Sequence, residues 1–170
     1  MKKISSNLAG SELQAYKDEF ERKYFEEFDN FLAKYSKSPT WLSNDQIAKE
    51  VINSIYYYNK KTYKLFAYCI MPNHVHIILQ PLNKRGEEFH SLSKIMYSLK
   101  RYTATSCNKS LKRKGQFWHH ENYNHFIREE KDLAYQLNYI KQNPIEAGLV
   151  DKAHRWKYTW TDETYDSDFD

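Results

Sequence analysis

Two histidines, His74 and His76, flank a single valine inside the apolar run 68–79. In an extended strand, residues i and i+2 point to the same face and lie roughly 6.6 Å apart. Both imidazoles can therefore reach one divalent metal ion, because neutral imidazole is a common metal ligand. Two histidines on the solvent face of a one-sided sheet would give the same spacing. Without further ligands the pair is only half of a metal site.

A tyrosine and an asparagine later in the chain could supply the rest. Tyr139 and Asn143 are four residues apart in a predicted helix, so they share one face with about 6 Å between their Cβ atoms. An amide oxygen suits Mg²⁺ or Mn²⁺, and a phenolate can act as a covalent nucleophile. His74, His76 and Asn143 would hold the metal while Tyr139 attacks a phosphate. The alternative is that Tyr139 only packs, since the chain has fifteen tyrosines.

The elements that must position these side chains follow from periodicity and breakers. Helices are expected over about 11–35, 43–59, 91–112 and 130–143, and strands over 63–70, 74–80 and 123–128. Pro72 fits only the turn between the first two strands, because proline cannot donate to a sheet ladder. The last helix should end at Asn143, because Pro144 disfavours the helical region for the residue before it. The order of elements predicts an α+β domain with an antiparallel sheet.

Two capping boxes and one aromatic stripe define the first two helices. The sequences SELQ (11–14) and SNDQ (43–46) have the serine and glutamine spacing of a capping box. Apolar residues then follow at steps of three and four and predict the buried face of a long amphipathic helix: Leu13, Tyr16, Phe20, Tyr24, Phe28, Phe31 and Tyr35.

Several motifs between residues 63 and 150 together resemble the REP-associated tyrosine transposases, a branch of the HUH single-strand DNA transposases. They are YKLFAYCIMPNHVHIIL (63–79), SKIMYSLKRYT (93–103), GQFW (115–118) with Glu121 and Tyr123, IREE (127–130) and YIKQNPIEAGLV (139–150). The resemblance implies that His74 and His76 are the metal-binding pair, Tyr139 the nucleophile and Asn143 the third ligand. It also implies a ferredoxin-like or RRM-like antiparallel sheet with helices on one face.

Two departures from that family pattern stand out. Family members usually begin with a strand of the type VTFR that pairs within the sheet, whereas this chain begins MKKISS and enters a helix. The sheet is then one strand short, has a substitute, or needs a partner subunit to complete it. His119 and His120 stand where the family more often has glutamine, and with His125 we expect them near DNA rather than on the metal.

The charge distribution predicts a nucleic-acid partner. The net charge is +4, and removing the five acids of 161–170 leaves +9 on residues 1–160. Residues 91–118 contain no acid, and their basic side chains are candidates for phosphate contacts: Lys94, Lys100, Arg101, Lys109, Lys112, Arg113 and Lys114. Trp118 and Tyr123 could stack on unpaired bases. Trp118 could equally belong to the core, which is the interpretation we favour for Phe117.

Composition sets the remaining expectations. The length suits one domain over 1–160 followed by an acidic tail over 161–170, which either folds back as a DNA mimic or is solvated. Cys69 and Cys107 form no disulfide framework or zinc cluster, and Cys69 is expected to be a buried thiol. No signal-peptide pattern or membrane-spanning run is present, so a cytoplasmic location without membrane contact is expected.

The sequence therefore predicts a metal-dependent endonuclease and strand transferase that uses Mg²⁺ or Mn²⁺. By resemblance, its substrate would be single-stranded DNA at the foot of a repeat hairpin, cut through a 5′-phosphotyrosine intermediate by a monomer or homodimer. The rival is a non-catalytic, domesticated or truncated hairpin-binding protein with the same fold, which the missing first strand favours. A structural metal domain fits poorly, because two histidines and an amide leave the metal site open.

Overall fold

A computed structural model of the chain describes residues 10–34, 38–83, 88–120 and 122–165. In chain order, its elements are α1 (Gly10–Lys34), η1 (Trp41–Ser43), α2 (Asp45–Tyr58), β1 (Tyr63–Ile70), β2 (Val75–Pro81), α3 (Leu92–Ser110), α4 (Glu130–Glu146), η2 (Ala153–Arg155), β3 (Thr159–Thr161) and η3 (Glu163–Tyr165). The predicted α+β class with an antiparallel sheet is confirmed.

The sheet of the described residues has the order β2-β1-β3, with both pairings antiparallel. β1 is the central strand and is almost entirely buried, which explains why its sequence is apolar except at the half-buried Lys64. The turn after β1 contains Pro72 and is closed by the backbone N–H of Met71, which donates to the carbonyl of His74 at 2.9 Å. This turn sets the register in which Ile70 faces Val75.

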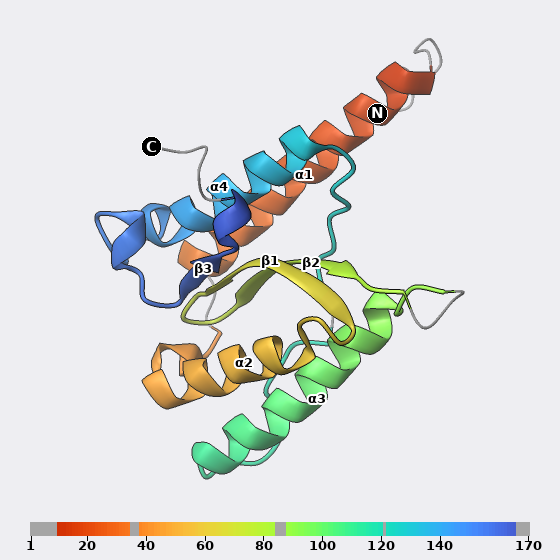
Figure 1. Ribbon diagram of the computed structural model, residues 1–170. Coiled ribbons are helices and arrows are strands. Elements are labelled where there is room, and N and C mark those ends of the chain that lie inside the picture. The colour runs from red at the N-terminus through yellow and green to blue at the C-terminus, as the bar shows by residue number, and fades with distance from the viewer. Residues whose placement is uncertain (1–9, 35–37, 84–87, 121, 166–170) are drawn as a thin grey trace.

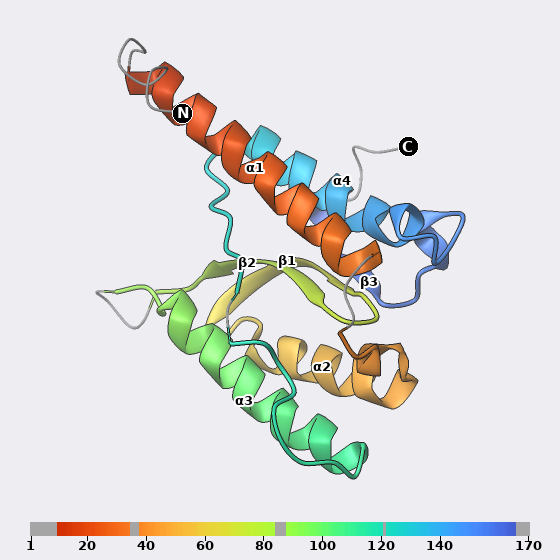
Figure 2. The same ribbon diagram turned by 180° about the vertical axis from the view of Figure 1, so that it is seen from behind.

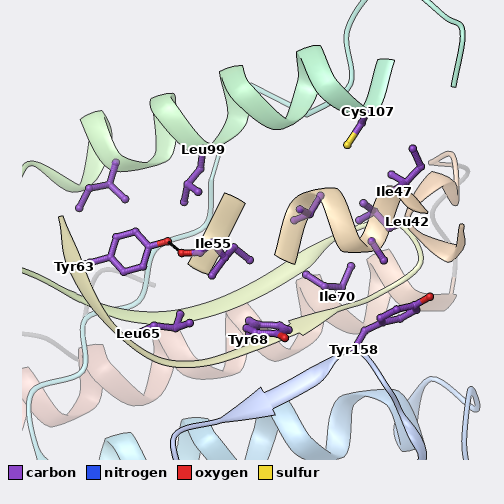
Figure 3. Close-up of a cluster of buried hydrophobic side chains, with 13 residues drawn as sticks. Leu42, Ile47, Ile55, Tyr63, Leu65, Tyr68, Ile70, Leu99, Cys107 and Tyr158 are labelled. Atoms are coloured by element: carbon purple, nitrogen blue, oxygen red, sulfur yellow. Dashed lines mark hydrogen bonds between the residues drawn. The ribbon is translucent and has the colours of Figure 1, made fainter. Parts of the chain in front are cut away.

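Helices cover both faces of the sheet. α2 and α3 lie on one face, and α1 and α4 lie side by side on the other (Figures 1 and 2). The larger core lies beneath α2 and α3, where the Tyr63 hydroxyl donates to the Ile55 carbonyl at 2.7 Å (Figure 3). A smaller core, which includes Phe66, Ile78 and Leu137, lies beneath α4. The expectation of helices on one face only is therefore wrong.

The strand predicted over 123–128 is absent. Residues 122–129 form no ladder with any described strand. A strand needs a neighbour whose backbone groups pair with its own. No described residue before β1 forms a strand that could be this neighbour, since the first described element, α1, is a helix that begins at Gly10.

α4 runs three residues beyond the predicted end and contains Pro144 in its last turn. Proline there removes only the hydrogen bond to the carbonyl four residues earlier, and the ring is buried. The helix ends instead at Glu146, with Ala147 as C-cap, and Gly148 has a φ of +70° that turns the chain so that the Leu149 N–H reaches the Pro144 carbonyl at 2.9 Å. Asn143 consequently keeps a helical backbone, one turn after Tyr139.

α1 forms where expected, but the predicted buried face is wrong. The aromatic stripe is largely in solvent, with Tyr16, Phe20, Tyr24, Phe28 and Phe31 each at least 42% exposed. The side chains that face the sheet and α4 are Phe25 and Asp29, on an adjacent face of the helix. Residue 35 and the first capping box lie outside the described side chains.

Smaller differences concern α2 and the C-terminal segment. The N-cap of α2 is Asn44 rather than Ser43, because the Asn44 side chain accepts from the backbone N–H groups of Gln46 and Ile47. Thr161 ends β3, and Tyr165 packs on Phe66 with ring centroids 5.3 Å apart. Residues 161–165 therefore belong to the folded body, and 166–170 lie outside the described residues.

Candidate active site

The histidine pair lies on the face of the sheet that α1 and α4 cover. The Nε2 atoms of His74 and His76 are 3.1 Å apart, and both rings are nearly buried. Val75 lies between them and packs into the core on the opposite face. The alternation of β2 therefore places both imidazoles on one side, as the spacing predicts.

α4 brings Tyr139 and Asn143 to the same place. The Asn143 amide nitrogen is 3.2 Å from His76 Nε2, and the Tyr139 ring stands edge-on to the His76 ring with centroids 6.1 Å apart. Asn143 is buried and Tyr139 is half-buried. A metal ion would need the amide oxygen of Asn143, which takes the place of the nitrogen when the amide turns by 180°.

A fifth side chain, which the sequence did not reveal, sits among these four. Asp29 of α1 places Oδ1 2.9 Å from His74 Nε2 and 3.2 Å from His76 Nε2. Its other oxygen, Oδ2, accepts hydrogen bonds from the Tyr139 hydroxyl at 2.6 Å and the Asn143 amide at 2.5 Å. Asp29, His74 and His76 form a cluster that could hold a metal ion.

The electrostatics of the cluster follow from burial and contact. Burial opposes ionisation of Asp29, but hydrogen bonds and the charges of His74 and His76 hold the pKa of its carboxyl well below the usual range. Burial lowers the pKa of His74, although Asp29 opposes that shift. The Asp29 carboxylate is therefore ionised at neutral pH.

The signal that could have revealed Asp29 was local. Asp29 is four residues after Phe25 and three before Leu32, so an acid interrupts a second apolar face of the helix. The aromatic stripe beside this face has a more regular spacing, so the periodicity favoured the stripe as the buried face. An acid between buried apolar neighbours needs a partner, and the sequence does not show that His74 provides one.

Asn73 ties α1 to the histidine motif. Its Nδ2 donates to the Leu32 carbonyl at 2.9 Å, and its Oδ1 is 2.7 Å from His74 Nδ1. Because an amide oxygen can only accept, His74 carries a proton on Nδ1, and its Nε2 is the ring nitrogen that faces the cluster. Phe25 packs against the site, and its ring centroid lies 5.9 Å from that of His76 and 5.6 Å from that of Tyr139.

These side chains fit a divalent metal ion. His74 Nε2, His76 Nε2 and Asp29 Oδ1 form a triangle with sides of 2.9, 3.1 and 3.2 Å. Ligands at about 2.1 Å from an octahedral ion lie about 3.0 Å apart, which matches these spacings. Imidazole suits transition-metal ions, and carboxylate and amide oxygens suit Mg²⁺ or Mn²⁺.

The basic residues predicted to contact DNA lie on the other face of the sheet, on α3 and the segment after it (Figure 1). Two of these basic residues make contacts within the protein. Lys100 donates to the carbonyls of His119 and His120 at 2.7 and 3.3 Å. Arg113 donates to the Gln116 carbonyl and lies over the Trp41 ring. The exposed basic side chains are Lys94, Arg101, Lys109, Lys112 and Lys114.

The predicted stacking residues are partly used in packing. Trp118 donates from Nε1 to Thr103 at 2.8 Å and packs on the larger core, as Phe117 also does. Tyr123 packs on α1, with its ring 5.0 Å from Phe25. Trp118 nevertheless lines an open groove of about 420 Å³ between α3 and residues 115–124, together with Tyr97 and Arg101. This groove, with the exposed basic residues, is the candidate surface for DNA.

The sequence profile of the family described as "Transposase IS200 like" matches residues 31–143, which span β1, β2, the histidine pair, Tyr139 and Asn143. The chain belongs to the IS200-like transposase family. A Haemophilus influenzae protein, named as a candidate REP-associated tyrosine transposase, is 28% identical over 102 residues. That match covers 57% of this chain and 58% of the relative, so the chain spans under two thirds of the relative's length.

A solved structure has the same fold as this IS200-like transposase. It is described as a REP-associated tyrosine transposase bound to a REP hairpin, with a TM-score of 0.58 at 21% identity. The match covers 74% of this chain and 70% of that one. The resemblance drawn from the sequence motifs is confirmed. None of the described helices of the transposase has the length and apolar character needed to cross a bilayer.

Proposed function

We propose that this IS200-like transposase is a metal-dependent endonuclease and strand transferase that cuts single-stranded DNA beside a repeat hairpin. The observation that carries the proposal is the convergence of His74, His76, Tyr139 and Asn143. Membership of the family, together with the fold of a protein bound to a REP hairpin, supports the choice of substrate.

The proposed reaction needs no external energy source. The Tyr139 oxygen attacks phosphorus, its proton leaves, and the bond from phosphorus to the 3′ oxygen breaks. The 3′ oxygen takes up a proton, and the phosphate remains on Tyr139 as a 5′-phosphotyrosine ester. Attack by a 3′-hydroxyl reverses the step and joins strands. His74, His76 and Asn143 would hold Mg²⁺ or Mn²⁺, which when bound offsets charge on the phosphate.

The two candidate surfaces suggest how DNA reaches the site. The groove lies on the α3 face, and residues 122–129 lead from there past β2 to α4 (Figures 1 and 2). We infer that the hairpin binds at the groove and the exposed basic side chains. Its single-stranded foot then passes along the edge of β2 toward Tyr139.

Formation of a covalent adduct tests the proposal. The protein is incubated with a single-stranded DNA that contains a hairpin and Mn²⁺, and a denaturing gel is read for a protein–DNA band. Tyr139→Phe should abolish the band, because no ester can form. Tyr135→Phe changes a tyrosine one turn earlier on α4 and should leave the band intact.

The non-catalytic alternative has one structural argument in its favour: no described residue supplies the first strand of the family sheet. If hairpin DNA binds but no adduct appears with Mg²⁺ or Mn²⁺, the protein is a DNA-binding protein that retains the fold. An adduct that persists in Tyr139→Phe would show that the nucleophile is a different residue.

A further inference from the structure

Asp29 occupies the centre of the candidate site although it comes from a different helix than the other groups. Its side chain is 5% exposed, and each carboxylate oxygen contacts two of the four neighbouring functional groups. A buried carboxylate without compensating partners is costly, so this placement requires an explanation in terms of its neighbours.

The two oxygens of Asp29 face different partners. Oδ1 is directed at His74 Nε2 and His76 Nε2, whereas Oδ2 accepts from Tyr139 and Asn143. One oxygen thus lies among metal-binding atoms, and the other holds the hydroxyl of the proposed nucleophile. A carboxylate can bridge these roles because it has about four lone-pair sites.

The atoms around Oδ1 form the donor set of a divalent metal site. Asn73 accepts from His74 Nδ1, so Nε2 is the ring nitrogen that faces Oδ1, 2.9 Å away. His76 Nε2 lies 3.2 Å from the same oxygen, and the three groups form a cluster that could hold a metal ion. Two histidines with one carboxylate are a ligand set that proteins use for divalent metal ions.

We propose that Asp29 is the anionic ligand of the metal site, binding through Oδ1 beside His74 and His76. Through Oδ2 it positions the Tyr139 hydroxyl next to the metal. This inference rests on the proposed function. It means that α1 contributes a metal ligand and a positioning residue to the site. Asn73, in the turn between β1 and β2, holds His74 against the same helix, because it bonds both the Leu32 carbonyl and His74.

Mn²⁺ binding to the full chain tests the inference without DNA or turnover. Calorimetric titration compares wild type, Asp29→Asn, His76→Ala and Glu27→Gln. Asp29→Asn keeps the shape and removes the charge, so affinity should fall tenfold or more. Glu27 is an exposed acid on the same helix, and Glu27→Gln should bind Mn²⁺ like wild type.

Each outcome separates the two proposals. If Asp29→Asn binds Mn²⁺ as tightly as wild type, or more tightly, Asp29 is not a ligand, while the proposed function stands wherever His76→Ala loses binding. If wild type binds no Mn²⁺, the metal-dependent function itself fails and the inference fails with it. Circular dichroism reports whether Asp29→Asn folds. Should it not fold, Asp29→Glu restores the charge and should regain part of the affinity, and no recovery in a folded Asp29→Glu protein would overturn the inference.

Discussion

The buried polar side chains beneath α1 have one another as partners. Asp29, His76 and Asn143 are all buried and lie within hydrogen-bond distance of each other. Removing one takes a hydrogen-bond partner from each of the other two, and a buried polar group left unsatisfied typically costs about 1–3 kcal/mol. Substitutions at these positions therefore lower stability as well as function, and every activity measurement on them needs a folding control.

The two cysteines predict a response to alkaline pH. Cys69 and Cys107 are fully buried, and burial raises the pKa of each thiol to about 12. Above pH 9 the unfolded chain loses protons that the native chain keeps. The free energy of unfolding should therefore fall between about pH 9 and 12, by up to about 1.4 kcal/mol per pH unit for each thiol.

A thiol reagent and denaturation curves check this expectation. At pH 8.5 a disulfide reagent should label neither cysteine in the native protein and both in guanidinium. Native Cys69 that reacts at once would contradict the buried placement. A double Cys→Ala variant would lose packing but should show a shallower decline of stability at alkaline pH.

Four of the five side chains in the candidate site could be predicted because each pair is local in sequence. His74 and His76 share a strand face, and Tyr139 and Asn143 share a helix face. The likeness to a known family then joined the two pairs. Asp29 could not be found this way, because its partners are at least 45 residues away and its own helix presents a more regular apolar stripe.

At the scale of elements, the end of α4 makes a clear prediction. Gly148 has φ +70°, and a Cβ added there would meet no atom within 4 Å. The cost of Gly148→Ala is therefore one of backbone conformation, about 1 kcal/mol. Urea denaturation monitored by circular dichroism measures this loss in the free energy of unfolding.

The matched variant for that measurement is Gly148→Asn, because asparagine tolerates the left-handed region better than alanine. It should lose less stability than Gly148→Ala. Equal stability of Gly148→Ala and wild type would mean that the helix does not end on a left-handed residue. The same result would return Pro144 to consideration as the signal that ends α4.

Elements were predictable where local rules act alone. β1 matches its predicted bounds, since its apolar run is interrupted by Pro72 just beyond the strand. The absence of the strand expected over 123–128 could not be predicted, because strand pairing depends on a neighbour that no local sequence pattern reveals. The face that α1 buries was also missed, since Phe25 and Asp29 are chosen by what lies opposite them.

For the whole molecule, the exposed basic residues in the last turn of α3 and just after it give a test of DNA binding. Lys109, Lys112 and Lys114 are exposed, whereas Arg113 contacts Gln116 and Trp41 and should stay in place. Replacing the three lysines by alanine should weaken hairpin binding for all sequences alike. The slope of log affinity against log salt should flatten by about 0.7 for each phosphate that is no longer neutralised.

Fluorescence anisotropy at several salt concentrations gives both the affinity for hairpin DNA and the slope of log affinity against log salt. Lys152→Ala removes an exposed positive charge after α4, away from α3, and serves as the control. An unchanged salt slope in the triple variant would mean that these lysines do not neutralise phosphates. DNA would then have to bind elsewhere, with Lys94 and Arg101 as the next exposed basic candidates.

The order of the elements along the chain has a consequence for biosynthesis. The histidines, α3 and the groove are translated before Tyr139 and Asn143. A polypeptide that stalls before residue 139 thus contains the residues proposed to hold DNA but not the group proposed to break it. It also lacks β3, which pairs with the central strand, so the proposed nucleophile is made only shortly before the strand that completes the sheet.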